Sequence, residues 1–251
     1  MKTKKILGLI LLISLVAIGA QRVGSWLPYI GNLDTPSNSH ISKYYITNSQ
    51  KDTGSPNIVT AVLADYRSFD TLFETCVLYL SGIVVISSLQ RNKKKKQNTE
   101  LIIKEKETKA IFGGIVLDAA FRMIVPVIMI YGVYVLFHGE VSLGGGFQAG
   151  ALLACAYILD RIIPSFNNNL GIITSEGAII LAGIGGCLYL FTGLMTIAGG
   201  GRFLEYDFLP IPFSHCHSAG IFMIECGVTV CVFAVLINIL EMVLERTEFD
   251  D

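Results

Sequence analysis

Charged residues are scarce in this chain of 251 residues. They make up 16% of the sequence, whereas soluble domains average about 25%. The deficit excludes an intrinsically disordered chain and a coiled coil, because both need more charge. Basic and acidic residues also balance, at 19 and 20. Nucleic-acid-binding domains usually carry a basic surplus, so the balance argues against that class of partner.

Cysteines and cofactor motifs are also sparse. Six cysteines are too few for a disulfide scaffold, in which they exceed roughly 8–10% of residues. The glycine run 144–146 lacks the Lys-Ser/Thr that follows the glycines of a phosphate loop. Adjacent ligands chelate one ion poorly, so we expect the run His215-Cys216-His217 to be a loop, not a metal site. The sequence predicts no metal, nucleotide, haem, flavin or iron–sulfur cofactor and no active site of its own.

Apolar residues are abundant and gathered in runs. They make up 52% of the chain, with a mean hydropathy of +0.59, and a membrane-spanning helix needs about 20 of them in succession. Six runs fit: 6–20, 71–89, 115–137, 146–163, 178–198 and 219–240. We therefore predict an all-α, polytopic membrane protein with six transmembrane helices. The first run also resembles a signal peptide, but its length favours an uncleaved anchor.

The basic residues predict the orientation of these helices. Lys and Arg gather in cytoplasmic segments. If the N-terminus is cytoplasmic, the outer segments hold few of the 19 basic residues: Arg22, Lys43, Lys51 and Arg202. Both termini are therefore predicted to be cytoplasmic. The charged stretch 91–110 then reads as a cytoplasmic linker between a two-helix unit, 1–90, and a four-helix domain, 111–251.

Ionisable residues at the start of the second run are informative, because each costs about 2.5–3.5 kcal/mol at membrane depth. Arg67, Asp70 and Glu74 fall on one face of a helix. Arg67 and Asp70 are expected to form an interfacial ion pair that sets the depth of the helix. Glu74 lies one turn deeper with no basic neighbour in its own helix, which favours a place in a proton or ion relay.

Arg122 and Glu225 are charged residues inside later apolar runs, the third and the sixth. Arg122 precedes Pro126, a residue that bends helices, and either reaches towards the interface or pairs with a carboxylate elsewhere. Glu225 is flanked by apolar residues, which favours an ion pathway or an inter-subunit contact over a satisfied structural acid. Asp160 and Glu176 lie near run ends and are expected to be interfacial.

Two parts of the sequence resemble a known family. Residues 57–74, with the string Asp-Tyr-Arg-Ser-Phe-Asp-Thr-Leu-Phe-Glu from Asp65 to Glu74, resemble the small E-type subunit of membrane-bound hydrogenases and the C-terminal part of the large A-type subunit of Mrp antiporters. Residues from about 111 onward resemble the MnhB domain. The matching features there are Arg122, Pro126, Gly139, the string Gly144-Gly145-Gly146-Phe147-Gln148 and residues 222–228. Two positions depart from the usual pattern: Leu143 replaces a proline, and Glu225 stands where an aspartate is often found.

The resemblance implies a membrane subunit of a multisubunit Na⁺/H⁺ antiporter of the Mrp type, or of a homologous respiratory complex such as a membrane-bound hydrogenase. Its partners would be the other subunits, Na⁺, H⁺ and the lipid bilayer of the cell membrane. The ion-translocation residues it implies are Asp65, Arg67, Asp70, Glu74, Arg122 and Glu225. Glu74 or Glu225 would exchange protons or coordinate sodium, and Gly144, Gly145 and Gly146 would allow close helix packing. An independent small transporter and a purely structural subunit remain alternatives.

Overall fold

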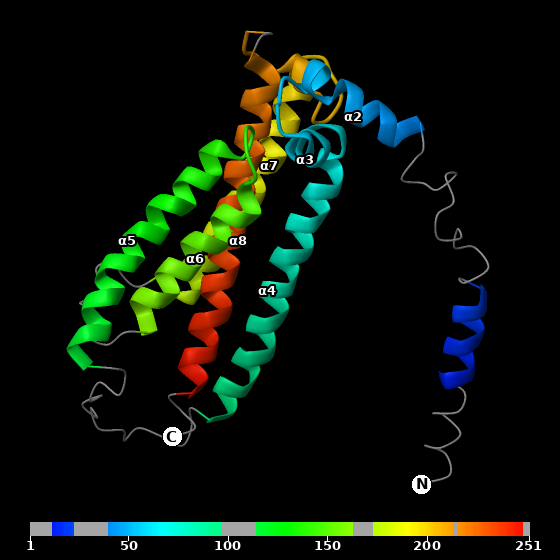
Figure 1. Ribbon diagram of the computed structural model, residues 1–251. Coiled ribbons are helices and arrows are strands. Elements are labelled where there is room, and N and C mark those ends of the chain that lie inside the picture. Colours follow the sequence, from blue (N-terminus) through cyan, green and yellow to red (C-terminus); the bar gives the residue numbers. More distant parts are fainter. Residues whose placement is uncertain (1–11, 23–39, 97–113, 163–172, 213–214, 248–251) are drawn as a thin grey trace. The chain divides into compact units, whose positions relative to one another are not determined.

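The computed structural model describes residues 12–22, 40–96, 114–162, 173–212 and 215–247 (Figure 1). Every regular element within these ranges is a helix, and none is a strand. The predicted all-α class is therefore confirmed. Most of the predicted linker and the start of the first apolar run lie outside the described residues. The chain divides into two compact units, Met1–Thr47 and Asn48–Asp251.

The first unit contains the apolar helix Leu12–Arg22. Its large apolar side chains are exposed, Leu15 by 67%. Eleven residues at about 1.5 Å each extend for about 16 Å, which is short of the ~30 Å hydrocarbon core of a bilayer. The first predicted span therefore stays a prediction. Helix α2, His40–Thr53, begins in this unit and ends in the second.

The second unit is a bundle of long helices around α8. These are α4 (Ser68–Lys96), α5 (Gly114–His138), α6 (Gly146–Ile162), α7 (Ser175–Ala198) and α8 (Cys216–Thr247). Helix α8 packs against α4, α6 and α7, whereas α5 packs mainly on α6 (Figure 1). Within the segments long enough to span a membrane, 67% of α8 is buried and only 17% of α5. Helix α8 is thus the centre of the bundle, and α5 lies at its edge.

Four of these helices are long and apolar enough to cross a membrane. Their membrane-length segments are Ser68–Ser88, Ala119–His138, Ser175–Ala198 and Cys216–Leu240. Helix α6 covers the predicted run 146–163 but has 17 residues, or about 25 Å at about 1.5 Å per residue. The chain is therefore a multi-pass membrane protein, while the count of six spans and the cytoplasmic termini stay predictions.

Glycines let α6 and α7 approach the backbone of α8. A Cβ atom on Gly146 would lie 2.5 Å from the carbonyl oxygen of Glu225, and one on Gly150 would lie 2.7 Å from another carbonyl of α8. On α7, a Cβ atom on Gly185 would lie 2.6 Å from the amide nitrogen of Cys231. Small residues spaced in this way permit the close helix contacts that stabilise membrane bundles. Helices α6 and α7 therefore pack directly against the backbone of α8.

The chain before α4 is fastened to the loop that follows α5. The side-chain oxygen of Asn57 accepts a hydrogen bond from the amide of Val59 at 3.0 Å, which caps the short helix α3, Ile58–Thr60. Its side-chain nitrogen donates to the carbonyl of Gly139 at 2.9 Å. One side chain thus starts a helix, by the usual capping role of Asn, and joins two distant parts of the sequence.

Helix α3 leads into a π-helical turn, η2 (Ala61–Tyr66). The amide of Arg67 donates to the carbonyl of Val62 at 2.8 Å, the bond to the fifth preceding residue that defines this geometry. Such turns are rare and are frequent at functional sites. This one holds Asp65, and α4 begins directly after it.

Candidate functional site at the start of helix α8

Glu225 lies in the third turn of α8 and is only 8% exposed. The loop between α5 and α6 covers it. A Cβ atom on Gly139 would lie 3.0 Å from its Oε2, and one on Gly145 would lie 3.2 Å from its Oε1. Gly145 has a φ of +137°, a conformation that favours glycine. The glycine backbone therefore follows the carboxylate closely, and we call Glu225 with this loop the glycine cradle.

A second acid lies near the glycine cradle. Within the described part of the chain, the Glu225 carboxylate forms no salt bridge. Glu140, in the loop that covers it, is close enough for its negative charge to repel a charge on Glu225. The hydroxyl of Ser218 donates a hydrogen bond to the Glu140 carboxylate. Ser218 and Glu225 are seven residues apart on one helix, so both face the same side of α8. Two carboxyl groups and a hydroxyl thus line that side.

His217 bridges two more acids at the start of α8. Its Nδ1 lies 2.5 Å from Oδ2 of Asp65, which comes from η2, and its Nε2 lies 3.0 Å from Oδ1 of Asp207. Asp207 comes from the 3-10 helix η3, Tyr206–Phe208. The Asp65 side chain is 14% exposed and that of Asp207 is 44% exposed. Ionised carboxylates only accept hydrogen bonds, so both bonds form when each ring nitrogen carries a proton.

Tyr206 holds the two acid-bearing turns together. Its hydroxyl donates to the carbonyl of Ala64 in η2 at 2.8 Å, and its side chain is buried. Burial, followed by the proximity of Tyr189 and Asp65, raises the pKa of the Tyr206 hydroxyl well above its ordinary value. The hydroxyl is therefore a neutral, permanent donor. It fixes η3 against η2, which keeps Asp65 and Asp207 on opposite nitrogens of the His217 ring.

The predicted charges of α4 lie elsewhere. Nε of Arg67 donates to Oδ2 of Asp70 at 2.6 Å, and these side chains are 59% and 46% exposed. Glu74 is exposed one turn further along α4. Of the predicted ionisable residues, the structure thus places Asp65 and Glu225 near the start of α8. Arg67, which directly precedes α4, and Asp70 and Glu74, which lie on α4, are instead at an exposed face.

Arg122 is also distant from Glu225. Its side chain is exposed on α5, about 24 Å along the helix from His138, the end that adjoins the glycine cradle. The three predicted packing glycines each face a different part of the bundle. A Cβ atom on Gly144 would lie 2.8 Å from the carbonyl of Val135 in α5, while Gly145 faces the Glu225 carboxylate and Gly146 the backbone of α8.

Sequence reasoning missed several of these side chains. The expected loop at 215–217 was wrong, because α8 begins at Cys216. Had the helical period been extended backwards from Glu225, Ser218 would have appeared on its face. Asp207 had no such signal, since it comes from a non-periodic connection. Asp160, expected at the membrane interface, is 1% exposed between the helices, and neither carboxylate oxygen has a hydrogen-bond partner in the described residues; its depth in the membrane stays a prediction.

The fold and this site define a class of protein. The chain is a helical membrane protein whose central helix carries buried ionisable groups at its amino-terminal end. Two family models match it. Residues 116–238 match a domain related to the MnhB subunit of the Na⁺/H⁺ antiporter, and residues 11–106 match the E-type subunit of MBH. The chain belongs to the family of Mrp-type antiporter subunits in which an E-type segment is joined to an MnhB-related domain.

Individual relatives agree with this family. A probable A/B-type K⁺/H⁺ antiporter subunit of Rhizobium meliloti (strain 1021) is 24% identical over 249 residues, which are 88% of this chain and 24% of that protein. A chain of the Mrp complex from Dietzia sp. DQ12-45-1b has the same fold, with a TM-score of 0.65 at 22% identity over 94% of this chain and 26% of that one. A chain of the membrane-bound sulfane sulfur reductase (MBS), an archaeal respiratory membrane complex, gives 0.64 at 26% identity, with 94% and 97% covered. This chain thus spans about a quarter of the antiporter relative's length.

Proposed function

We propose that this chain is a membrane subunit of a multisubunit cation/proton antiporter of the Mrp type, or of a homologous respiratory complex, in the cell membrane. The family supports this assignment, and the near-complete match to one chain of a respiratory membrane complex supports a subunit of this size. Its partners are then the other subunits of that complex. The ions it helps to move are Na⁺ and H⁺.

The observation that supports an ion-handling role is the burial of Glu225 in the glycine cradle. A carboxylate at membrane depth needs a counter-charge or a proton, and this one has no salt bridge in the described residues. Carboxylate oxygens are ligands for hard cations. Glu225 therefore alternates between a proton and a sodium ion, with Glu140 as the second acid at the same site.

The test replaces Glu225 by Gln in the assembled complex. Glutamine keeps the shape of the side chain but holds neither a titratable proton nor a charge for sodium. We expect at least a tenfold loss of sodium-dependent pH-gradient formation in membrane vesicles, with normal assembly on native gels. Glu225→Asp is the matched control, because it keeps the carboxylate, and it should retain a measurable part of the activity. Normal transport by Glu225→Gln would contradict the role of this residue.

A structural subunit is the second candidate, and the exposed side of α4 favours it. Large apolar residues recur there at helical spacing, among them Phe73, Val77, Leu80 and Val84, which are 58%, 66%, 58% and 62% exposed. Such a stripe suits a neighbouring helix, and Arg67, Asp70 and Glu74 lie near its start. If the chain only supports assembly, Glu74→Gln should weaken the complex on native gels. Neither Glu74→Gln nor Glu225→Gln should then change activity per assembled complex.

A further inference from the structure

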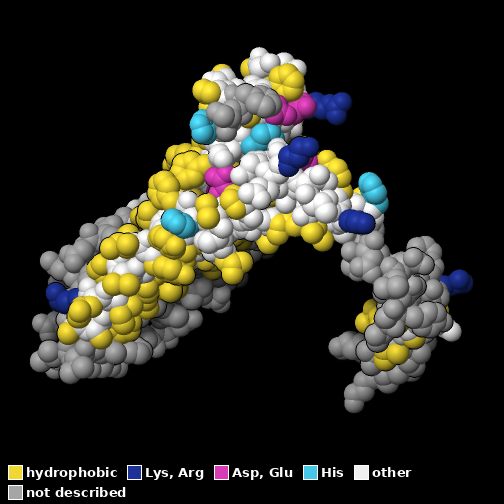
Figure 2. Space-filling model, turned by 45° about the horizontal axis from the view of Figure 1, so that its top comes forward, with side chains coloured by type: hydrophobic (Ala, Val, Ile, Leu, Met, Phe, Trp, Pro, Cys, Tyr) yellow, Lys and Arg dark blue, Asp and Glu magenta, His cyan; other side chains and the backbone are white. Residues whose placement is uncertain are grey.

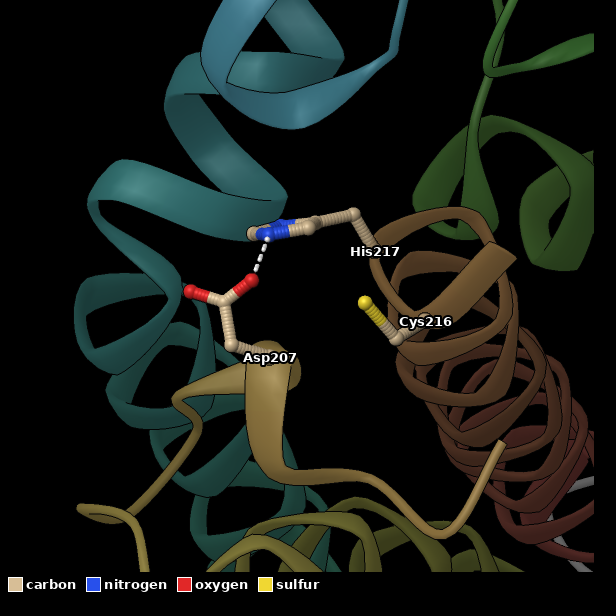
Figure 3. Close-up of side chains that lie close together, drawn as sticks. All are labelled: Asp207, Cys216 and His217. Carbon is tan, nitrogen blue, oxygen red and sulfur yellow. Dashed lines mark hydrogen bonds and ion pairs between the residues drawn. The ribbon is translucent and has the colours of Figure 1, made fainter. Parts of the chain in front are cut away.

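Three side chains at the start of α8 have the chemistry of a metal site that the proposed transport does not use. They are Asp207, Cys216 and His217, and their ligand atoms all lie within 4.8 Å of one another. Figure 3 shows the Asp207 carboxylate and the Cys216 sulfur on the same side of the His217 ring, one from η3 and the other from the first turn of α8. The ligands thus come from two elements that the fold brings together. Asp207 supplies the further ligand that the adjacent pair Cys216 and His217 lacks in the sequence, which is why the sequence alone argued against a metal site here.

The spacing suits a small divalent ion. Zinc lies about 2.0–2.1 Å from nitrogen, 2.0–2.2 Å from oxygen and 2.3 Å from sulfur, so tetrahedral ligands are about 3.3–3.8 Å apart. Nε2 of His217 and Oδ1 of Asp207 are 3.0 Å apart. A tetrahedral zinc ion between them requires these two atoms to lie a few tenths of an ångström further apart. It also requires the Cys216 sulfur, which lies within 4.8 Å of both, to come closer.

Asp65 makes this more than a surface cluster. Nδ1 of His217 lies 2.5 Å from the Asp65 carboxylate, which is better buried than Asp207. Histidines that bind metals almost always donate their other ring N–H to such a partner, which fixes the tautomer and aims the ligand nitrogen. Asp65 therefore leaves Nε2 as the nitrogen for the ion.

We propose that Asp207, Cys216 and His217 bind a zinc-class divalent ion, with Asp65 as the residue that positions His217. A thiolate with an imidazole selects zinc over magnesium or calcium, which prefer oxygen alone. Binding displaces the thiol proton of Cys216 and any proton on Nε2. Zinc is then neutralised by one thiolate and one carboxylate. Three protein ligands leave the fourth position to water.

The position of the site determines what the ion does. Asp207 is 44% exposed and Cys216 is buried, so the ion enters from the Asp207 side and ends against α8. Once bound, it joins η3 to the first turn of α8, which the contact between Asp65 and His217 already joins to η2. The ion is a structural clamp at this end of the bundle.

The test uses cobalt as a spectroscopic substitute for zinc on the purified, chelator-treated full-length chain. Cobalt bound to Cys216 gives a near-ultraviolet thiolate charge-transfer band, which added zinc abolishes by displacement. Cys216→Ser, a near-isosteric change, should remove the band. Asp65→Asn should keep the band but weaken cobalt affinity by about 10–100-fold. His215→Ala and Cys226→Ser are matched controls from the same stretch and should leave both unchanged.

Each outcome decides the proposal. The absence of a charge-transfer band in the unmodified chain overturns it, whatever the variants do. A band that survives in Cys216→Ser, or that disappears in Cys226→Ser, assigns the metal to another cysteine and overturns it too. Glu225→Gln should retain the band, so the metal site and the proposed ion pathway stand or fall separately.

Discussion

Glu225 and Glu74 are both acids in apolar helices, yet the structure treats them differently. Glu225 is 8% exposed in the glycine cradle of the central helix α8. Glu74 is exposed on α4, beside the ion pair of Arg67 and Asp70. The first has its surroundings supplied by this chain, whereas the second needs a neighbouring molecule to supply them. Among the described residues on the face shown in Figure 2, hydrophobic side chains are numerous and acidic ones are few.

The difference shows that the position of an acid along an apolar helix does not determine whether its carboxylate is buried. Burial of a carboxylate depends on how many helices pack against its own. Helix α8 contacts three others closely through glycines, while α4 has one long side without neighbours in the described part of this chain. The surroundings of an acid on α8 are therefore formed by this chain, whereas those of an acid on the exposed side of α4 are formed by its partners.

The largest effect expected from a single change is at Gly146, where the glycine cradle meets α8. Gly146→Ala places a Cβ atom 2.5 Å from the carbonyl oxygen of Glu225, and a backbone atom cannot move aside cheaply. We expect a loss of about 3 kcal/mol in the free energy of unfolding, the upper end of overpacking costs. The midpoint of unfolding in detergent measures it. Gly186→Ala is the control, because nothing lies within 4 Å of its Cβ position, and an equal loss there would refute the explanation.

An intermediate effect is expected where α4 is tied to the packed side of the bundle. The hydroxyl of Tyr189 on α7 donates to the carbonyl of Ser68 at 2.6 Å, and both residues are buried. Tyr189→Phe removes this bond while the Ser68 carbonyl keeps its partner within α4, so the loss should be about 0.5–1.5 kcal/mol. Tyr134→Phe, on the exposed side of α5, should change stability by less than about 0.5 kcal/mol. Equal losses in the two variants would mean that the Ser68 bond does not stabilise the bundle.

The smallest effect is expected on the exposed face of α4. Arg67→Gln removes the ion pair with Asp70, whose side chains are about half exposed, so the loss in the purified chain should be about 0.2–1 kcal/mol. It should shrink further in high salt, because exposed charges are screened. Unfolding midpoints at low and high salt measure both. A salt-independent loss above about 1 kcal/mol would show that this face is packed inside the chain.

The sequence predicted the helices well and their surroundings poorly. Five apolar runs match α4 to α8 closely, because apolar length is a local property. Cys216 and His217 were placed in a loop since three potential ligands in a row resemble a connection, and the helix start preceded the apolar run. Which acids are covered depends on packing between distant segments, so the exposure of Glu74 and the burial of Asp160 could not be read from their own runs. Asp207 joins His217 only because a non-periodic connection folds back onto α8.

The π-helical turn at 61–66 has a consequence for how the sequence tolerates change. Residues before and after it belong to two helical registers, offset by the extra residue that the turn absorbs. Removing one residue there would convert the π turn into an α turn and rotate the residues before it by about 100° relative to those after it. Asp65 would then lose its alignment with His217, or α4 would turn its apolar stripe to a new direction. The one extra residue of the π-helical turn thus allows Asp65 to face His217 while the apolar stripe of α4 keeps its present direction.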